Sequence, residues 1–131
     1  MWKDYLIKSK SNLAAAERDL QAQGYDPCVS RAYYATYLAA IAALIALTDF
    51  QRRGKYWDHS ATASEFSRRL ILRQKVFPRN MAGTLDDLRL YRHQADYDNR
   101  FISRKATERS LQKARFFVQQ IDNKLQTHEG S

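Results

Sequence analysis

The sequence predicts an all-α protein, a five-helix up-and-down bundle with a central buried helix. Residues 32–47 are apolar or aromatic at every position except Thr36, and Ala outnumbers the β-branched residues, which favours helix over strand. A helix that is apolar on all sides is buried on all sides. The run is shorter than the roughly 20 residues of a membrane span, and Arg31 and Asp49 flank it. We therefore expect the other helices to pack around it.

The first predicted helix spans residues 2–21. Its packing face is marked by three leucines spaced seven residues apart, Leu6, Leu13 and Leu20. Gly24 is expected to end this helix in the left-handed conformation. Asp26 and Pro27 suit the N-cap and the first position of the second helix, which contains the central apolar run and is expected to end near Asp49.

The longest linker, residues 50–59, precedes the third predicted helix. Thr62 and Glu65 fit a capping box, which places the start of that helix near residues 60–62. Its core face consists of Ala63, Phe66 and Leu70. Pro78 then breaks the chain, because proline cannot continue a helix.

The last two predicted helices begin near Thr84 and after Ser103, the expected N-cap of the final helix. A polar turn over residues 96–102 separates them. The fourth helix has a core face of Leu85, Leu88, Tyr91 and Ala95. The fifth has the most regular apolar row, Leu111, Ala114, Val118, Ile121 and Leu125. The chain contains no repeat, so we expect one domain over residues 1–131.

The positive charge is concentrated in one half of the chain. The net charge is +8, and residues 52–115 hold sixteen Lys/Arg against seven Asp/Glu, whereas the remainder holds six against seven. Such a distribution favours a polyanionic partner such as RNA, DNA or a nucleotide. Within this half, Arg68 and Arg69 are expected to contribute to binding. A basic helix surface that only keeps the protein soluble is the alternative.

Several classes of site are not indicated. The single cysteine, Cys28, excludes an internal disulfide and a site of several thiolates, and the three histidines are too scattered to suggest a metal. No Gly-rich phosphate loop exists among four glycines. We therefore expect no cofactor and no metal. The N-terminus resembles the first turn of an amphipathic helix rather than a signal peptide, so we expect a cytoplasmic protein with no membrane association.

A first group of candidate residues lies at the start of the central helix, in Ser-Arg-Ala-Tyr-Tyr-Ala-Thr-Tyr over residues 30–37. Tyrosine buries its ring but needs a partner for its hydroxyl. These hydroxyls can simply tie the helix to its neighbours. Alternatively, Arg31 and Tyr34 line a phosphate site.

A second group lies toward the end of the fourth helix. Arg89, Arg92, His93 and Asp96 fall at positions i, i+3, i+4 and i+7, so they share one helix face if the helix extends that far. Two guanidinium groups, an imidazole and a carboxylate can hold a phosphodiester and move a proton, with Tyr97 beside them as a hydrogen-bond donor. An Arg–Asp ion pair beside an incidental histidine is the alternative.

Together, the two stretches resemble the small stand-alone HEPN domains of bacteria and archaea. The similar motifs are Ser-Arg-x-Tyr-Tyr-Ala on the second helix, Arg-x-x-Ala-Asp-Tyr after the fourth, and Asp-His-Ser at residues 58–60. The order of the helices is also similar, over roughly residues 5–125. The branch with these motifs is associated with minimal nucleotidyltransferases.

The resemblance implies a homodimeric helical bundle. Many HEPN proteins are toxins that cut RNA without a metal and are paired with a nucleotidyltransferase antitoxin. Their motif is Arg, four to six residues, then His, and the two copies meet across the dimer interface. The Arg holds the scissile phosphate, and the His assists attack by the ribose 2′-hydroxyl, leaving a cyclic phosphate.

This chain departs from that motif at the expected place. The residues 97–99, where a histidine should follow Arg92, are Tyr, Asp and Asn. Arg53 and His59 have the permitted spacing but belong to the linker, where His59 is a candidate for RNA binding. Two hypotheses follow: a toxin that cleaves RNA at a dimeric basic cleft, and a non-catalytic nucleotide- or RNA-binding module that partners a nucleotidyltransferase. A plain helical interaction domain is the third.

Overall fold

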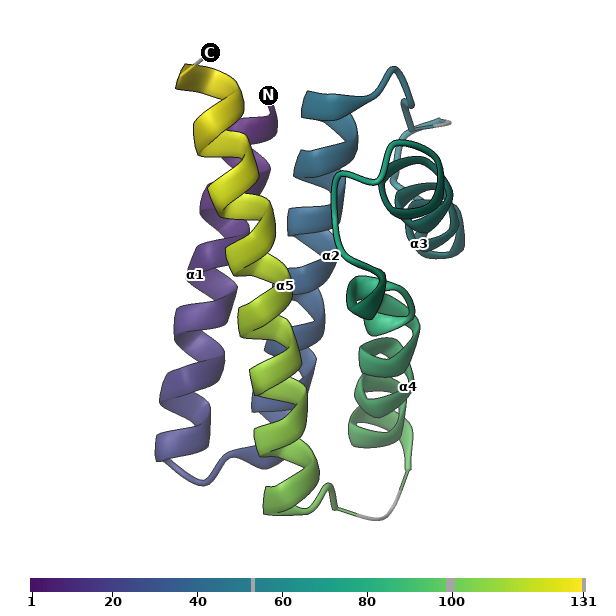
Figure 1. The fold of residues 1–131 in the computed structure, drawn as a ribbon. Coiled ribbons are helices and arrows are strands. Elements are labelled where there is room, and N and C mark those ends of the chain that lie inside the picture. The colour runs from purple at the N-terminus through teal and green to yellow at the C-terminus, as the bar shows by residue number, and fades with distance from the viewer. Residues whose placement is uncertain (53, 99–100, 131) are drawn as a thin grey trace.

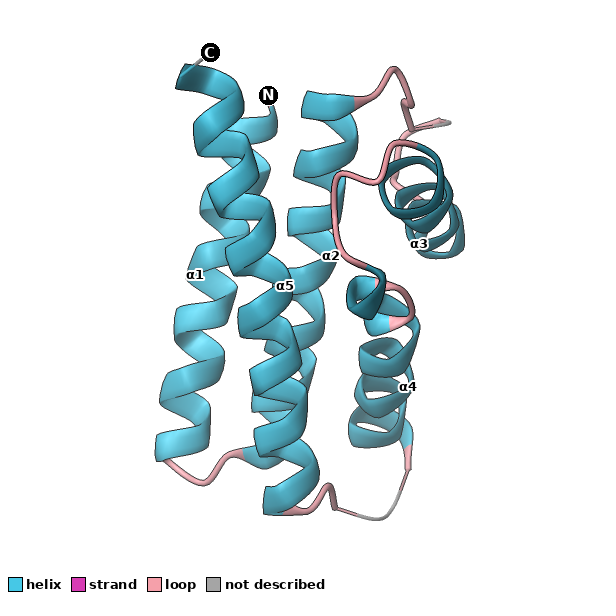
Figure 2. Cartoon of the chain, in the orientation of Figure 1, coloured by secondary structure: helices cyan, strands magenta, loops and turns pink. Residues whose placement is uncertain are grey.

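A computed structural model describes residues 1–52, 54–98 and 101–130 of the chain. Within these residues the backbone forms five α-helices, a π-helix (η1) and a short 3-10 helix (η2), and no strand (Figures 1 and 2). In chain order the elements are α1 (Trp2–Gln21), α2 (Tyr25–Leu47), α3 (His59–Glu65), η1 (Phe66–Arg73), η2 (Arg79–Met81), α4 (Thr84–Tyr97) and α5 (Arg104–Gly130). The predicted all-α fold with five helices is confirmed.

Helix α2 lies at the centre of the bundle. It packs against α1, most extensively, and also against α5, α4 and α3. In Figure 1, α1, α2 and α5 run alongside one another, α4 flanks α2 on the other side, and α3 is seen nearly end-on. The small side chains of α2 allow this close packing, and six of them are completely buried: Ala32, Ala35, Ala39, Ala40, Ala42 and Ala43. The predicted central buried helix is confirmed.

By length and composition alone, α2 is the one described helix that could cross a membrane. However, 72% of its most apolar window is buried inside the protein. An apolar helix covered by other helices is the core of a bundle. The composition of α2 is therefore explained by the packing that Figure 1 shows.

Helix α1 has the predicted bounds, but a different residue ends it. Gln23 takes the left-handed conformation, with φ 61°, whereas Gly24 has φ −87°. The N–H of Gly24 donates to the Asp19 carbonyl oxygen at 2.7 Å, and the N–H of Gln23 donates to the carbonyl of Leu20. These two bonds define a Schellman motif. The prediction that Gly24 is the left-handed residue is wrong, because the left-handed position of this motif falls on Gln23 and Gly24 is the residue after it.

Helix α2 begins earlier than its sequence signal indicated. Gly24 is the N-cap, and Asp26 lies inside the first turn. The Asp26 carboxylate instead accepts the backbone N–H of Ile102 at 3.2 Å and so ties α2 to the start of α5. Pro27 remains in the first turn, where an absent N–H costs little. Helix α2 ends at Leu47 rather than near residue 49.

Helix α3 also has a different cap from the one predicted. Asp58 is the N-cap, and its carboxylate accepts the N–H of Ala61 at 3.3 Å. Thr62 lies one turn inside, where its hydroxyl donates to the Asp58 carbonyl at 2.8 Å, so the proposed capping box is wrong. The predicted core residues Phe66 and Leu70 are buried, and they lie in the π-helix that continues α3.

Helix α4 begins after Gly83, which is left-handed with φ 83°, so Thr84 is the first helical residue and not the cap. The helix continues to Tyr97, which places most of the predicted polar turn beyond it. The Ser103 hydroxyl accepts the N–H of Ala106 at 3.1 Å and caps α5 as predicted. The apolar row of α5 is buried at all five predicted positions, Leu111, Ala114, Val118, Ile121 and Leu125.

Candidate functional site

Helices α2, α3 and α4 bring tyrosine, histidine and arginine side chains together on one side of the bundle. Tyr33 and Tyr37 lie one turn apart on α2. His59 is the first residue of α3, directly after the cap Asp58. Because this cap determines where α3 starts, it also sets the position of His59 beside α2. Arg89 and Arg92 come from α4.

The imidazole of His59 is held on two sides by tyrosines. Its ring lies parallel to that of Tyr37, with centroids 4.2 Å apart and planes 1° apart. The Nδ1 atom of His59 shares a hydrogen bond with the Tyr33 hydroxyl. The Tyr37 hydroxyl in turn donates to the Trp57 carbonyl at 2.8 Å, which anchors the linker before α3. The ring orientation of His59 is therefore set, and Nε2 is the nitrogen that has no partner among the described residues.

Burial and two neighbouring cations keep His59 neutral at neutral pH. Burial lowers the pKa of His59 from 6.5, the charges of Arg89 and Arg92 lower it further, and Asp58 acts in the opposite direction. Burial also raises the pKa of Tyr33 to about 12, so its hydroxyl keeps its proton. A neutral imidazole can accept a proton, whereas a hydroxyl that stays protonated can only donate or accept hydrogen bonds.

Arg92 is positioned by aromatic rings and a carboxylate. Its guanidinium carbon lies 4.8 Å from the ring centroid of Tyr34 and 5.7 Å from that of Tyr33. Its Nε lies 3.3 Å from a carboxylate oxygen of Asp96. This contact is an ion pair without hydrogen-bond alignment, since Nε is buried and has no hydrogen-bond partner. The other oxygen of Asp96 accepts a hydrogen bond from the Ser30 hydroxyl at 3.0 Å. Helix α2 therefore positions the carboxylate that pairs with Arg92.

Arg89 lies on the α3 side of α4, where its guanidinium donates to the Ser60 hydroxyl at 3.2 Å. Ser60 directly follows His59, so this bond brings a second cation to the histidine. We call the side chains gathered around His59 and Arg92 the Tyr–His–Arg cluster. Its members are Ser30, Tyr33, Tyr34, Tyr37, His59, Arg89, Arg92 and Asp96.

His93, predicted to share the face of Arg92, and Tyr97, predicted to lie beside that face, are both outside this cluster. His93 and Tyr97 are exposed, and their rings contact each other with centroids 4.9 Å apart. The helix period separates them from Arg92, which faces the tyrosines of α2. The structure therefore places His59, and not His93, beside Arg92.

The other predicted binding residues form ion pairs elsewhere. Arg31 pairs with Asp19 of α1 at 3.1 Å. Arg68 and Arg69 both pair with Glu65 at 2.6 Å. Arg69 also reaches Asp49 at 2.7 Å, and so links η1 to the end of α2. Arg53, which has the family spacing to His59, lies outside the described residues.

From the sequence, a role in binding was expected only for Arg31 and Tyr34, although Ser30, Tyr33 and Tyr37 belong to the same candidate stretch. Their signal was present, because Tyr33 and Tyr37 are spaced i and i+4 on an otherwise apolar helix and their hydroxyls need partners. The partner His59 follows 26 and 22 residues later, beyond a linker whose course has no periodicity. Sequence spacing alone could not bring these groups together.

Comparison with protein families shows a match over nearly the whole chain. The family model described as HEPN domain matches residues 2–124, nearly the whole chain. No curated protein matches the chain. The helical architecture agrees with this assignment. The chain belongs to the HEPN domain family.

Proposed function

We propose that the protein is the toxin of a toxin–antitoxin pair and acts in the cytoplasm as a metal-independent endoribonuclease. Its proposed antitoxin is a minimal nucleotidyltransferase, and its proposed site is a basic cleft in a homodimer. Membership of the HEPN family and the excess of Lys/Arg in residues 52–115 support action on RNA. The observation that carries the proposal is the neutral His59 flanked by Arg89 and Arg92.

The two arginines suit a phosphodiester. Guanidinium groups bind phosphate oxygens with two parallel hydrogen bonds. Arg92 is held in place by Tyr34 and Asp96, so little of its motion has to be lost when a phosphate binds. Cations positioned in advance stabilise the charge that develops on the phosphate as the reaction proceeds. Arg92 is the proposed phosphate ligand, and Arg89 supports it.

His59 is the proposed proton carrier. In the proposed tautomer, Nδ1 carries the ring proton and donates a hydrogen bond to the Tyr33 hydroxyl oxygen, so Nε2 has a free lone pair. Nε2 accepts the proton of the ribose 2′-hydroxyl as that oxygen attacks the phosphorus. The bond from 2′-oxygen to phosphorus forms while the bond from phosphorus to the 5′-oxygen breaks. The products are a 2′,3′-cyclic phosphate and a 5′-hydroxyl, whose oxygen takes up a proton from water. The Tyr33 hydroxyl and the Tyr37 ring hold the imidazole in this orientation.

The exposed face of α4 supports the proposed homodimer. Leu90 and Tyr97 are 69% and 72% exposed, and His93 lies between them on the same face. Exposed apolar side chains in a row mark an interaction surface. His93 is a second proposed proton carrier, and Tyr97 is its proposed hydrogen-bond donor. Because both lie on this exposed face, they could act only on an RNA strand bound across the dimer interface.

A second candidate function is a non-catalytic RNA- or nucleotide-binding module that partners a nucleotidyltransferase. The observation that favours it is the absence of histidine at residues 97–99, where the family motif expects one after Arg92. In this case the Tyr–His–Arg cluster holds a phosphate and performs no proton transfer.

Cleavage of end-labelled RNA by purified protein in the presence of EDTA tests the proposal. The wild-type protein should cut, and Arg92→Ala and His59→Gln should each lower the rate at least about a hundredfold. His128→Ala, at the far end of α5, is the matched histidine control and should cut normally. His93→Ala distinguishes the two proton carriers. Loss of cleavage in His93→Ala but not in His59→Gln contradicts our assignment of His59, and a wild-type protein that binds RNA without cutting supports the second function.

A further inference from the structure

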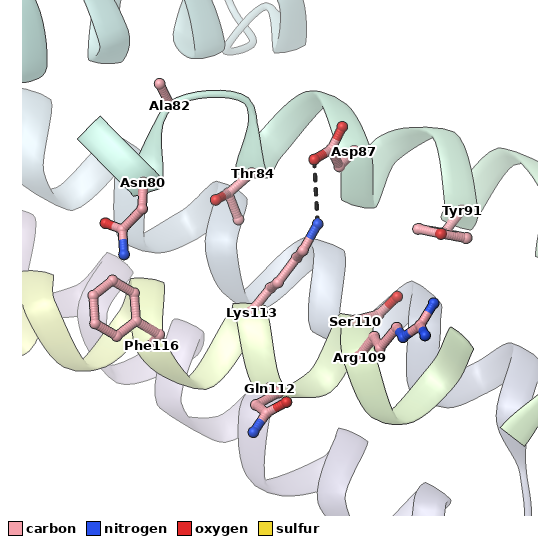
Figure 3. A pocket seen from close by; sticks show the side chains of 10 residues that line it. All are labelled: Asn80, Ala82, Thr84, Asp87, Tyr91, Arg109, Ser110, Gln112, Lys113 and Phe116. Carbon is pink, nitrogen blue, oxygen red and sulfur yellow. Dashed lines mark hydrogen bonds and ion pairs between the residues drawn. The ribbon is translucent and has the colours of Figure 1, made fainter. Parts of the chain in front are cut away.

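A separate hollow lies between α4 and α5, away from the Tyr–His–Arg cluster. It has a volume of about 450 Å³, and residues of α4, α5 and the segment before α4 line it (Figure 3). In Figure 3, Asn80 and Phe116 lie at one end, and Tyr91 and Arg109 lie toward the other. We call this hollow the α4–α5 groove. The proposed RNA cleavage site does not use it.

The α4–α5 groove contains an arginine, Arg109, whose charge is not paired by the described part of the chain. Arg109 makes no ion pair with any residue that the structure describes, whereas Arg104, on the same helix, pairs with Glu108 at 2.7 Å. Lys113 reaches across the groove to Asp87 at 3.4 Å, as Figure 3 shows. Their side chains are 52% and 56% exposed, and exposed pairs of this kind are weak. Both cations can therefore bind an anionic ligand.

Thr84 offers a hydroxyl to the same hollow. The residue is only 6% exposed and lines the groove, and its hydroxyl makes no hydrogen bond with any described residue. The hydroxyl oxygen itself is accessible to solvent. It can therefore form a hydrogen bond with a ligand in the groove.

The ends of the groove offer aromatic rings. Phe116 is 40% exposed, although large apolar residues elsewhere on α5 are buried. Tyr91 is half-buried at the α4 wall. Aromatic rings beside cations are the usual means of holding an unpaired RNA base and its phosphate. An acidic peptide would satisfy the cations and leave the rings without a partner.

We propose that the α4–α5 groove binds one nucleotide of single-stranded RNA that flanks the site of cleavage. The base stacks on Phe116 or Tyr91, Arg109 and Lys113 bind the phosphate, and the Thr84 hydroxyl bonds to the ribose or the phosphate. This inference rests on the proposed action on RNA. Helix α4 connects the two sites, because Arg89 faces α3 while Asp87 faces α5.

Fluorescence anisotropy with a 2′-O-methyl hexanucleotide tests the groove without cleavage, because the attacking hydroxyl is absent. Arg109→Ala and Phe116→Ala should each weaken binding about tenfold, since stacking and phosphate contacts have this magnitude. Thr84→Val keeps the shape of the side chain and should weaken binding severalfold. Arg104→Ala, which removes a paired arginine outside the groove, is the matched control and should change the dissociation constant less than about twofold.

The outcomes separate this inference from the proposed function. Unchanged hexanucleotide binding in Arg109→Ala and Phe116→Ala, or no binding by the wild-type protein, overturns the groove assignment even if the protein cuts RNA. If Arg109→Ala and Phe116→Ala lose hexanucleotide binding but the wild-type protein cuts no RNA, the groove is confirmed as an RNA-binding site. The same result contradicts the proposed endoribonuclease activity. A labelled hexaglutamate peptide is the alternative probe. If the peptide binds the wild-type protein and loses affinity in Arg109→Ala, while hexanucleotide binding does not depend on Arg109, the ligand of the groove is an acidic protein and not RNA.

Discussion

Tyr37 and His59 lie with their rings parallel, 4.2 Å apart between centroids, although 22 residues separate them in the chain. Tyr37 also anchors the linker through its bond to the Trp57 carbonyl. One tyrosine therefore determines both where the linker returns to α2 and how the imidazole is oriented.

The first prediction concerns the titration of His59, measured by NMR of its ring protons. Its pKa should lie below 6.5. Arg89→Ala and Arg92→Ala should each raise the pKa, because each removes a positive charge that opposes protonation. Asp58→Asn should lower it. Arg104→Ala is a distant control and should leave the pKa of His59 unchanged. If Arg89→Ala and Arg92→Ala also leave this pKa unchanged, the two arginines do not lie close to His59.

The second prediction concerns the free energy of unfolding as a function of pH. Because the pKa of folded His59 is lowered, the unfolded chain binds more protons at this position once the pH falls below about 6.5. Stability should therefore decrease as the pH falls below about 6.5, until His59 is protonated in the folded protein as well. A second decrease should begin near pH 4, where the lowered pKa values of Glu65 and Asp122 act. Urea titrations of His59→Gln should lack the first decrease and keep the second.

The third prediction separates core from surface at the central helix. Ala39→Asp or Ala42→Asp should cost on the order of 4 kcal/mol or more, because a charge without a partner enters a fully buried position. Arg31→Ala should be mild, since its pair with Asp19 is half exposed. Thermal unfolding followed by circular dichroism measures both. If Arg31→Ala unfolds the protein as severely, Arg31 is structural and has no role in phosphate binding.

The fourth prediction concerns assembly. Leu90→Arg should convert the proposed two-fold dimer into a folded monomer, because it places a charge in the exposed apolar row of α4. Leu72→Arg is the matched control, since Leu72 is a similarly exposed leucine, 62%, on η1. Sedimentation at tens of micromolar protein measures the mass. A wild-type monomer at that concentration would exclude the dimer.

The fifth prediction concerns the basic half of the chain. RNA affinity should fall steeply with salt, in proportion to the phosphates neutralised. Charge reversal at Arg68 should weaken binding and leave the fold intact. Charge reversal at Arg69 should also lower the melting temperature, because Arg69 bonds both Glu65 and Asp49. Affinity measured between about 50 and 200 mM salt checks the first statement, and a salt-independent affinity would contradict it.

The helices were predictable from sequence because their signals are periodic. The row from Leu111 to Leu125 and the apolar run of α2 each extend over several turns, so an error at one residue does not change the result. The caps were not predictable to the residue. At the end of α1, Gln23 takes the left-handed conformation although its neighbour Gly24 has the stronger intrinsic preference for it. Asp58 and Thr62 are both good N-caps. At both helix ends, tertiary packing rather than local preference decides which residue has the role.

The candidate site was predictable only where one helix holds its members. The i, i+4 pair of Arg92 and Asp96 was anticipated and is present. His59 joins Arg92 only because α3 and α4 both pack against α2, and no local pattern encodes that contact. Conversely, His93 directly follows Arg92 in the sequence, but the turn of the helix between the two residues places His93 on the exposed side of α4.

The apolar surface of α2 has a consequence for how the protein is made. Helix α1 precedes α2 along the chain and packs against it most extensively, so these two helices can pair as soon as both have left the ribosome. The side of α2 covered by α5 stays open until the last helix is synthesised. During that interval the nascent chain exposes a surface that chaperones bind and that promotes aggregation. Interruption of synthesis before Arg104 should therefore leave an insoluble fragment rather than a smaller folded bundle.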